Sequence, residues 1–335
     1  MPERALITGA AGFIGSHVVD ALLERGWSVT GLDNFDSFYD PAVKRENLES
    51  AMSSPHFRLV EGDVRDLRLM QRVVEEAQPD VVIHLAARAG VRPSIEQPTL
   101  YAEVNVGGTS AVLEAALRAG VRRLVVASSS SVYGDSATPP FREDDPALHP
   151  VSPYAATKRA AELVCECWSS LVPDARIISL RFFTVYGPRQ RPDLAIHKFT
   201  RLLLSDRPIP FFGDGESSRD YTYITDIVDG VLGAVTRTGS GNGGHEIFNL
   251  GESATTSLKE LVALLEEVTG KRAVLERLPP QQGDVRRTFA DISRARSALG
   301  YAPSVPVREG IPKFVTWYRE RAAGRQPVTA RAASR

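Results

Sequence analysis

The sequence predicts an α/β fold, a doubly wound parallel sheet with a smaller, interleaved lobe toward the C-terminus. Short apolar segments of strand length alternate with helical patterns from residue 4 to residue 181. Beyond that point prolines and glycines cluster, and the helical patterns are separated by long connections. We therefore expect a sheet domain over residues 1–181, a lobe mainly over residues 182–324, and a frayed tail over residues 325–335.

Composition argues against several classes of function. Of 335 residues, 43% are hydrophobic and 24% are charged, and the formal net charge of -1 leaves no basic field for nucleic acid or anionic lipid. No run of about 18 apolar residues and no signal-peptide pattern occurs, which favours a cytoplasmic protein without membrane contact. Cys165 and Cys167 are too close in sequence for an ordinary disulfide and are expected on different faces of one helix. Neither a disulfide framework nor a zinc or other metal site is expected.

The chain opens with a predicted strand, a glycine turn and a helix. Arg4–Thr8 has the apolar character of a buried strand. The turn that follows carries Gly9, Gly12 and Gly15, a G-x-x-G-x-x-G spacing that lets a pyrophosphate approach N–H groups at a helix N-terminus. A tight packing turn is the alternative. We prefer the cofactor site because the second strand ends in Asp33, where an acid would accept the 2′-hydroxyl of NAD and repel the 2′-phosphate of NADP.

Two further strands are predicted before residue 90. A polar insertion over residues 34–55 precedes the first, residues 57–61. Asp63, which follows that strand, would accept a hydrogen bond from an adenine amino group or, equally, cap the next helix. The second strand, residues 81–87, is fully apolar and runs into small residues, as a buried parallel strand does beside a flat cofactor. His84 lies within this strand, so we interpret it as a packed core histidine.

Two more strands complete the predicted sheet. After a long helix from Thr99 that carries Asn105, the strand over residues 123–131 ends in four consecutive serines. Ligands of doubly wound sheets bind at the carboxyl ends of the strands, so these hydroxyls are expected in the ligand crevice. A sixth strand over residues 176–181 completes the alternation. The helices predicted in the lobe cover residues 196–204, 226–235 and 258–268.

Between the fifth and sixth strands, Tyr154 and Lys158 stand four residues apart on one face of a predicted helix. Ser152 is the expected N-cap of this helix, and Pro153 its first residue. A neighbouring cation and the positive end of a helix both favour a phenolate over the phenol, whose ordinary pKa is about 10. The pair can therefore move a proton, although Y-x-x-x-K also occurs by chance on solvated helices, so the interpretation depends on the other motifs.

Taken together, the glycine turn, the serine cluster and the Tyr154/Lys158 pair resemble the extended short-chain dehydrogenase/reductase family, whose sheet is the Rossmann fold, over nearly the whole chain. Within that family the chain is most similar to UDP-glucuronate 4-epimerases. It departs from their pattern at Arg88, where glutamine is expected, and at Arg287, which adds a charge. The segments that carry the similarity are residues 89–92, 128–134 and 181–193.

The resemblance implies a mechanism with NAD as bound cofactor. Tyr154 would take the proton of the sugar 4-hydroxyl while C4 gives its hydride to NAD+, leaving a transient 4-keto sugar. Lys158 would lower the tyrosine pKa and hold the nicotinamide ribose. Ser129, or as second choice Ser130, would hydrogen-bond the same hydroxyl. The cofactor-binding residues that the resemblance implies are Gly9, Gly12, Phe13, Ile14, Gly15, Asp33, Asn34, Asp63, Val64, Leu85, Ala86, Ala87, Asn105, Ser128, Tyr154, Lys158 and Val185.

An acidic sugar makes a further demand on the site. A 4-keto hexuronic acid is a β-keto acid, which loses CO2 when its C5–C6 bond aligns with the carbonyl π system. The resemblance implies that Thr184 and Arg191 clamp the carboxylate through charge-assisted hydrogen bonds. Galactose-type epimerases typically carry asparagine at the Thr184 position, which suits a hydroxymethyl group. The alternative for Arg191 is a solvated loop arginine.

Contacts to the nucleotide follow from family positions. Arg219 and Asp284 would bind the UDP pyrophosphate and ribose, and Phe211 or Phe212 would pack on the uracil. The substrate-binding residues that the resemblance implies are Arg92, Ser129, Ser130, Thr184, Arg191, Phe211, Arg219, Asp284 and Arg286.

We therefore expect epimerisation at C4 of a UDP-hexuronic acid, from UDP-glucuronate to UDP-galacturonate. The enzyme alternatives are a neutral UDP-glucose/galactose 4-epimerase and a UDP-glucuronate decarboxylase. The non-enzyme alternative is a nucleotide-sugar or NAD-sensing binding protein, against which the intact Tyr154 and Lys158 argue. A homodimer through helices near residues 99–118 and 153–168 is usual for such folds and is expected here.

Overall fold

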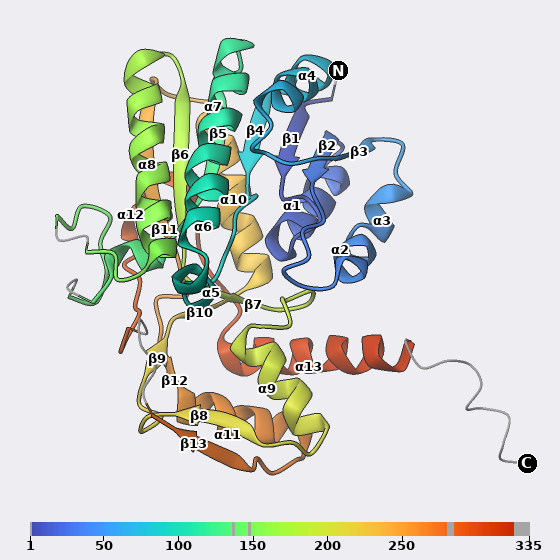
Figure 1. Ribbon diagram of the computed structural model, residues 1–335, viewed down its shortest axis with the longest axis vertical. Coiled ribbons are helices and arrows are strands. Elements are labelled where there is room, and N and C mark those ends of the chain that lie inside the picture. The colour runs from blue at the N-terminus through green and yellow to red at the C-terminus, as the bar shows by residue number, and fades with distance from the viewer. Residues whose placement is uncertain (1, 136–137, 147–148, 280–284, 325–335) are drawn as a thin grey trace, which may run out of the picture.

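The computed structural model describes residues 2–135, 138–146, 149–279 and 285–324. Its centre is a seven-stranded parallel sheet with helices on both faces, which confirms the predicted α/β class (Figure 1). The strand order β11-β6-β5-β4-β1-β2-β3 reverses between β1 and β4, and such a switch point leaves a ligand crevice at the carboxyl ends of the strands. The strands are β1 (Arg4–Thr8), β2 (Ser28–Asp33), β3 (Phe57–Glu61), β4 (Val81–His84), β5 (Arg123–Ser129), β6 (Arg176–Phe182) and β11 (Gly244–Leu250).

Alternate residues of the strands enter two cores on opposite faces of the sheet. In β1, Ala5 and Ile7 join the core that also contains residues of α1 (Phe13–Glu24) and α10 (Ile224–Thr238), whereas Leu6 joins the other core. Because both faces are covered, the central strands carry apolar residues at successive positions. The helices that contribute to the second core are α4 (Leu67–Ala77), α7 (Gly108–Arg118) and α8 (Pro153–Leu171).

Two strands end earlier than predicted. β4 stops at His84, after which the Leu85 N–H still bonds to the Thr8 carbonyl at 3.1 Å before the chain leaves the sheet. β5 stops at Ser129, and a 3-10 turn, Ser130–Tyr133, follows it. Both departures occur at the carboxyl edge, so they move the predicted polar and small residues out of the ladder and into the crevice.

Among the elements that the sequence prediction omits are the edge strand of the sheet and two short helices. β11 pairs in parallel with β6, so the sheet takes its edge strand from beyond residue 182. The insertion over residues 34–55 contains α2 (Pro41–Asn47) and α3 (Glu49–Met52). A local signal for α2 was present, since Asp40 accepts a hydrogen bond from the Ala42 N–H and a proline opens the helix.

The helix predicted from Thr99 forms with an irregular middle. It runs through α6 (Pro98–Ala102), a π-helical segment (Glu103–Gly107) and then α7, and a short α5 (Val91–Glu96) precedes it. A π-helical turn shifts the side chains that follow it relative to a regular helix. Asn105 lies within that turn.

The lobe lies below the sheet in Figure 1 and contains the predicted helices α9 (Ala195–Leu204) and α11 (Leu258–Thr269). These helices pack together with α13 (Val307–Gly324), beside a small parallel sheet of β8 (Ile209–Phe212) and β13 (Leu275–Leu278). The third predicted helix, α10, packs instead against the central sheet.

A second small sheet connects the lobe to the crevice. β7 (Thr184–Tyr186) and β10 (Tyr221–Tyr223) pair in parallel, and the Thr184 N–H bonds to the Asp220 carbonyl at 3.0 Å. Within the described part of the chain, no helix is both long enough and apolar enough to span a bilayer.

Candidate active site

A cavity of about 510 Å³ lies along the carboxyl ends of β1, β2, β4 and β5, within the range of small-molecule sites. Most of the residues predicted to bind cofactor line it, and so do four predicted for the substrate. The predicted residues that line the cavity are Gly9, Gly12, Phe13, Ile14, Gly15, Asp33, Asn34, Asp63, Val64, Leu85, Ala86, Ala87, Ser128, Ser129, Ser130, Tyr154, Lys158, Thr184, Val185 and Arg191.

The three glycines of the turn have different physical roles. Gly9 has a φ of 71°, and a Cβ there would lie 2.7 Å from the Ala86 nitrogen. A Cβ on Gly15 would lie 2.0 Å from the Gly9 carbonyl oxygen. These two positions are required for packing. A Cβ on Gly12 would meet only the Gly9 oxygen, at 3.1 Å, so this glycine mainly keeps the cavity open. The packing and cofactor interpretations of the motif therefore both apply.

The turn and Asp33 suit a dinucleotide. Gly12 precedes α1 without a side-chain cap, so the first N–H groups of this helix face the cavity as a pyrophosphate requires. Asp33 is 6% exposed and accepts hydrogen bonds from the Ala11 N–H at 3.0 Å and the Phe35 N–H at 2.8 Å. Burial raises the pKa of Asp33, and Lys44, 4.0 Å away, opposes that rise. The carboxylate keeps lone pairs for ribose hydroxyls.

Asp63 does not cap the helix that follows it. The N-cap of α4 is Asp66, which accepts from the Leu69 N–H at 3.0 Å. Asp63 instead binds Arg65 through two side-chain hydrogen bonds and accepts from Asn34 Nδ2 at 3.1 Å. The hydrogen bond from Arg65 is the main reason why the pKa of Asp63 falls to about 2. The acid therefore faces the cavity in its ionised form, whereas the helix-cap alternative is wrong.

His84 is the packed core histidine that the sequence predicts. Its Nδ1 lies 2.7 Å from Thr8 Oγ1 and its Nε2 lies 3.0 Å from Thr109 Oγ1. Burial lowers its pKa to about 3, so the ring is neutral.

Helix α8 brings Tyr154 and Lys158 to the cavity. The Ser152 hydroxyl caps the helix by accepting from the Ala155 N–H at 3.2 Å, as predicted, and Pro153 opens it. Lys158 Nζ donates to the Ala127 carbonyl at 2.7 Å, and burial lowers the Lys158 pKa to about 8. One partner of the lysine is therefore the end of strand β5.

The Tyr154 phenol contacts the serine cluster. Burial raises the Tyr154 pKa, whereas a hydrogen bond with Ser129 and the positive charge of Arg191 lower it. Lys158, to which the resemblance assigns that lowering, donates to Ala127 instead. The Ser128 hydroxyl is turned away from Tyr154, since it donates to Glu162 at 2.6 Å within a buried network. Among the described residues, the geometry therefore joins Tyr154, Ser129 and Arg191.

Arg191 is mostly buried, with 18% of its side chain exposed, so it is not a solvated loop arginine. Its Nε and Nη2 donate to the two carboxylate oxygens of Asp193 at 3.0 and 2.8 Å. Burial alone would lower the Arg191 pKa, but Asp193 outweighs burial and holds the pKa above its usual value. A permanent cation therefore lies beside the Tyr154 phenol.

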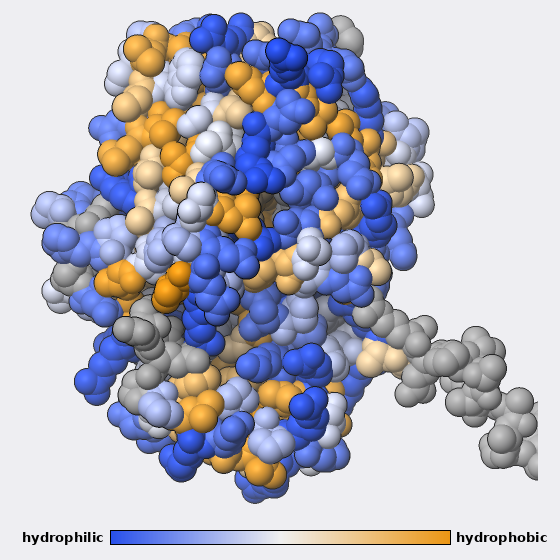
Figure 2. Space-filling view, viewed as in Figure 1, coloured by the Kyte–Doolittle hydropathy of each residue, from blue (hydrophilic) through white to orange (hydrophobic). Residues whose placement is uncertain are grey.

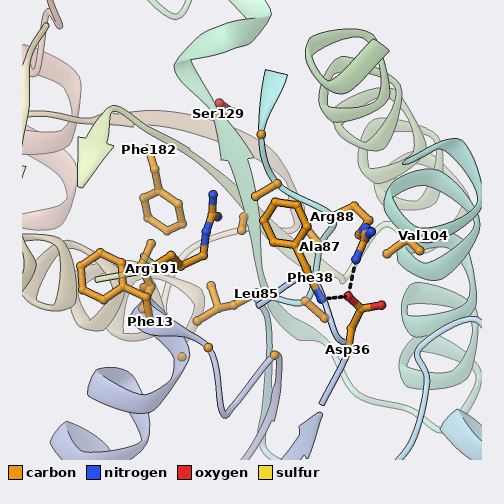
Figure 3. A pocket seen from close by; sticks show the side chains of 18 of the residues that line it. Phe13, Asp36, Phe38, Leu85, Ala87, Arg88, Val104, Ser129, Phe182 and Arg191 are labelled. Carbon is orange, nitrogen blue, oxygen red and sulfur yellow. Dashed lines mark hydrogen bonds and ion pairs between the residues drawn. The ribbon is translucent and has the colours of Figure 1, made fainter. Parts of the chain in front are cut away.

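Sequence reasoning missed a group of cavity residues from the insertion that follows β2. Asp36, Phe38, Tyr39 and Lys44 all line the cavity, as does Arg88. Figure 3 shows Phe38 between Arg88 and Arg191, with Asp36 hydrogen-bonded on the Arg88 side. The sequence marks Arg88 as a departure from the expected glutamine, but its partners in the insertion, Asp36 and Phe38, lie about fifty residues away in sequence and give no local signal.

Asn105 contacts the loop of Arg88 rather than the cavity. The Asn105 side chain is 1% exposed, accepts from the Arg88 N–H at 2.8 Å and donates to the Arg88 carbonyl at 3.0 Å. It also donates to Thr157 at 3.0 Å on α8. Its position between the two segments makes it a support for the cavity wall.

The remaining predicted substrate residues lie toward the lobe, outside the lining of this cavity. Arg219 Nη1 lies 3.5 Å from the Arg286 carbonyl, so these two predicted residues are brought together. Arg92 lies 5.4 Å from the ring centroid of the half-buried Phe212, whereas Phe211 is 2% exposed and belongs to the core. Asp284 lies outside the described residues, as does the tail over residues 325–335.

Comparisons with known proteins agree with this geometry. The sequence profile of the NAD dependent epimerase/dehydratase family matches residues 5–251. The UDP-glucuronate 4-epimerase of Thermodesulfobacterium geofontis is 40% identical over 316 residues, 94% of this chain and 96% of that protein. The solved structure of UDP-glucuronic acid 4-epimerase from Bacillus cereus, in complex with UDP-glucuronic acid and NAD, has a TM-score of 0.88 and 34% identity, covering 95% of this chain and 99% of that chain.

A solved structure with a neutral sugar is almost as similar. The UDP-glucose 4-epimerase from Thermotoga maritima, with UDP-glucose, has a TM-score of 0.86 and 34% identity, again covering 95% of this chain and 99% of that chain. The fold alone therefore does not select the sugar, and the side chains around the cavity must do so.

Proposed function

The chain belongs to the NAD dependent epimerase/dehydratase family, and we propose that it inverts C4 of a UDP-hexuronic acid, interconverting UDP-glucuronate and UDP-galacturonate. The observation that carries the proposal is the buried Arg191 guanidinium beside Tyr154. A neutral sugar brings no charge for that cation, whereas a hexuronic acid brings a carboxylate. NAD is the cofactor, and the open Gly12 position, the uncapped start of α1 and Asp33 are the parts of this chain that suit it.

The proposed chemistry assigns a role to each group around Tyr154. When bound, NAD+ supplies a reversible hydride acceptor for the sugar C4. The Tyr154 oxygen accepts the proton of the 4-hydroxyl as C4 becomes a ketone, and it returns the proton when the ketone is reduced on its other face. The Ser129 hydroxyl, which lines the cavity and lowers the Tyr154 pKa, would hold the same sugar oxygen. Because burial raises the Tyr154 pKa, the nearby charge of Arg191 helps the phenolate to form.

Arg191 and Thr184 would prevent loss of CO2 from the 4-keto intermediate. A guanidinium has five N–H donors, of which Asp193 takes one on Nε and one on Nη2. The others are available to hold the sugar carboxylate in one plane, together with the Thr184 hydroxyl, which also lines the cavity. With the carboxylate held in this way, the C5–C6 bond cannot align with the carbonyl π system.

In the lobe, we propose that Arg219 and Arg286 bind the UDP phosphates. Of the two phenylalanines, Phe212 is the better candidate to pack on the uracil, because Phe211 is 2% exposed and belongs to the core, whereas Phe212 is only half-buried. Arg92 beside Phe212 would belong to the same surface.

The test of the proposed function uses Arg191→Ala with Arg189→Ala as its control. Losing charge-assisted hydrogen bonds of about 1.5–3 kcal/mol should weaken UDP-glucuronate binding roughly 10- to 100-fold. The freed carboxylate should also let the variant release CO2 and accumulate a 4-keto pentose with NADH, which chromatography and absorbance detect. Arg189 is paired with Asp20 and lies outside the cavity lining, so its loss should change neither result.

Each alternative function predicts a different outcome of that test. A decarboxylase would release CO2 as wild type, and a neutral-sugar epimerase would turn over UDP-glucose faster than UDP-glucuronate. A binding protein would show no turnover at all. Wild-type turnover without CO2, followed by an Arg191→Ala variant with unchanged affinity, would show that Arg191 does not hold the carboxylate.

We further propose that the protein is a homodimer whose interface includes α8. Leu163 and Leu171 on this helix are 47% and 72% exposed. Figure 2 shows apolar residues gathered at the upper left, where Figure 1 draws α8. An exposed apolar face of this kind is typical of a contact with another chain.

A cytoplasmic location stays a prediction that cell fractionation would test.

A further inference from the structure

We propose that Phe38 is a positioning residue for the sugar-acid site. Its ring, held in place by Asp36 and Arg88, sets the plane in which Arg191 offers its remaining N–H groups. The inference rests on the proposed role of Arg191 toward the sugar carboxylate, and it gives Asp36 and Phe38, from the insertion after β2, a part in the same site.

Asp193 alone is a weak support for Arg191. It bonds one edge of the guanidinium, and 40% of its side chain is exposed to solvent. Solvent weakens such a pair, and two hydrogen bonds along one edge let the guanidinium move together with the carboxylate. A second contact, on the flat face of the Arg191 guanidinium, is needed to keep the edge that does not bind Asp193 pointing in a constant direction.

Phe38 supplies that contact. The Arg191 Cζ atom lies 5.5 Å from the centroid of the Phe38 ring, and the Arg88 Cζ atom lies 4.9 Å from the same centroid. The ring lies between the two guanidinium groups in Figure 3. Cations are attracted to the electron-rich faces of an aromatic ring, so Phe38 is held from one side and holds Arg191 on the other.

The position of Phe38 is itself fixed by hydrogen bonds. Asp36 Oδ1 accepts from the Phe38 N–H at 2.8 Å and also from Arg88 Nη1. The Arg88 backbone is held at both its N–H and its carbonyl by the buried Asn105 side chain. The ring therefore rests on a support that reaches α8 through Thr157, which Asn105 also bonds.

The charges of this arrangement balance. Asp36 forms an ion pair with Arg88 on one side of the ring, and Asp193 pairs with one edge of the Arg191 guanidinium on the other. Two cations can therefore stand close to one ring, because the acid on each offsets part of the desolvation cost and of the repulsion between them. A sugar carboxylate entering the cavity meets a guanidinium whose direction is already set, which lowers the ordering cost of binding.

The test compares Phe38→Leu with wild type in binding assays at saturating NAD. UDP-glucuronate binding should weaken about 3- to 10-fold, the range expected for a partly desolvated cation–π contact. Binding of UDP alone should stay unchanged, because it lacks the carboxylate. Phe38→Tyr, which keeps the ring, should bind UDP-glucuronate like wild type.

Phe35→Leu is the matched control. Phe35 belongs to the same loop and has an arginine, Arg45, 4.1 Å from its ring centroid, but it does not line the cavity. This variant should retain wild-type affinity for UDP-glucuronate. A loss equal to that of Phe38→Leu would mean that the loop as a whole, and not the Phe38 ring, is responsible, and would overturn the proposal.

A double variant separates this proposal from the proposed function. If Phe38 acts through Arg191, adding Phe38→Leu to Arg191→Ala should cause no further loss of UDP-glucuronate affinity. The positioning role would be overturned if the double variant bound UDP-glucuronate more weakly than Arg191→Ala by the full factor seen for Phe38→Leu alone. It would also be overturned if Phe38→Leu weakened the binding of UDP as much as that of UDP-glucuronate. If Arg191→Ala weakens binding and Phe38→Leu does not, the positioning role fails while the carboxylate clamp stands. If Arg191→Ala has no effect, both fail.

Arg88→Gln provides a second route should Phe38→Leu fold poorly. It removes the cation that holds the far side of the ring and replaces it by the residue expected from the family pattern. If Arg88→Gln weakens the binding of UDP-glucuronate, less than Phe38→Leu does, and leaves the binding of UDP unchanged, the proposal is supported. Wild-type affinity for UDP-glucuronate would overturn it.

Discussion

Tyr154 is proposed to act as a base although burial raises the pKa of its phenol. Protein groups only partly correct this rise, through the Ser129 hydroxyl and the Arg191 charge. The remaining stabilisation of the phenolate has to come from the loaded site, where the positive charge of a bound nicotinamide would act on the phenol. The pKa of Tyr154, and with it the ability of this residue to act as a base, thus depends on the charged groups around the phenol.

We predict that Tyr154→Phe lowers turnover of UDP-glucuronate by roughly 10²- to 10⁴-fold, because it removes the proton acceptor. The ring would keep its edge contact with Tyr101, 6.2 Å between centroids, so NAD binding should be nearly unchanged. Steady-state rates and calorimetric NAD titration measure the two effects. Tyr318→Phe, which loses a hydroxyl outside the cavity lining, should keep full turnover. Near-normal turnover by Tyr154→Phe would place the base elsewhere.

At the scale of elements, a buried ion pair fastens helix α8 to the sheet. Arg181 on β6 donates from Nε and Nη2 to the two oxygens of Glu162 at 2.8 and 2.9 Å, and both side chains are 1% exposed. Ser128 on β5 donates to the same carboxylate. Glu162 follows Tyr154 and Lys158 at successive four-residue steps, so it shares their face of α8. The pair therefore holds the catalytic face of the helix against two strands.

We predict that Glu162→Gln lowers the free energy of unfolding by about 3–5 kcal/mol at neutral pH, because it leaves Arg181 buried without its charge partner. Burial raises the Glu162 pKa, but Arg181 outweighs burial and the pKa lies below its usual 4.5. The ionised carboxylate thus stabilises the fold above pH 4.5, and that contribution is lost as pH falls through the folded-state pKa.

Urea unfolding at several pH values would test this prediction. The difference between wild type and Glu162→Gln should be largest near pH 7 and should shrink in acid below pH 4.5. Glu76→Gln is the control, because the Arg58–Glu76 pair is more than half exposed on both sides and should contribute less than about 1 kcal/mol. A difference that is independent of pH would show that the charge of Glu162 is not what stabilises the fold.

At the scale of the whole molecule, the proposed dimer predicts a particle of twice the 36.5 kDa chain mass in light scattering. Leu163→Glu should shift it toward the monomer, because a charge would replace an apolar side chain at the contact. Met52→Glu, a change at a 58% exposed position on α3, should leave the dimer intact. A monomeric wild type, or a Leu163→Glu variant that stays dimeric, would contradict the α8 interface.

Sequence by itself determined the features that depend on short-range pattern. Strands β1 to β6 followed from apolar runs, the α8 start from Ser152 and Pro153, and the cofactor crevice from the glycine turn and Asp33. Each of these signals is contained in a window of about ten to twenty residues, where backbone preferences, capping and side-chain period act. The same windows suffice to place Tyr154 and Lys158 on one helix.

Only the tertiary structure decided which distant side chains meet. It joined β11 to the edge of the sheet, paired Glu162 with Arg181, buried Phe211 while leaving Phe212 half-exposed, and set Phe38 between Arg88 and Arg191. The physical reason is that packing, desolvation and ion pairing act through space between residues far apart in the chain. A short sequence segment does not include the distant residue that it will contact, so these contacts cannot be predicted from local patterns and form only in the folded chain.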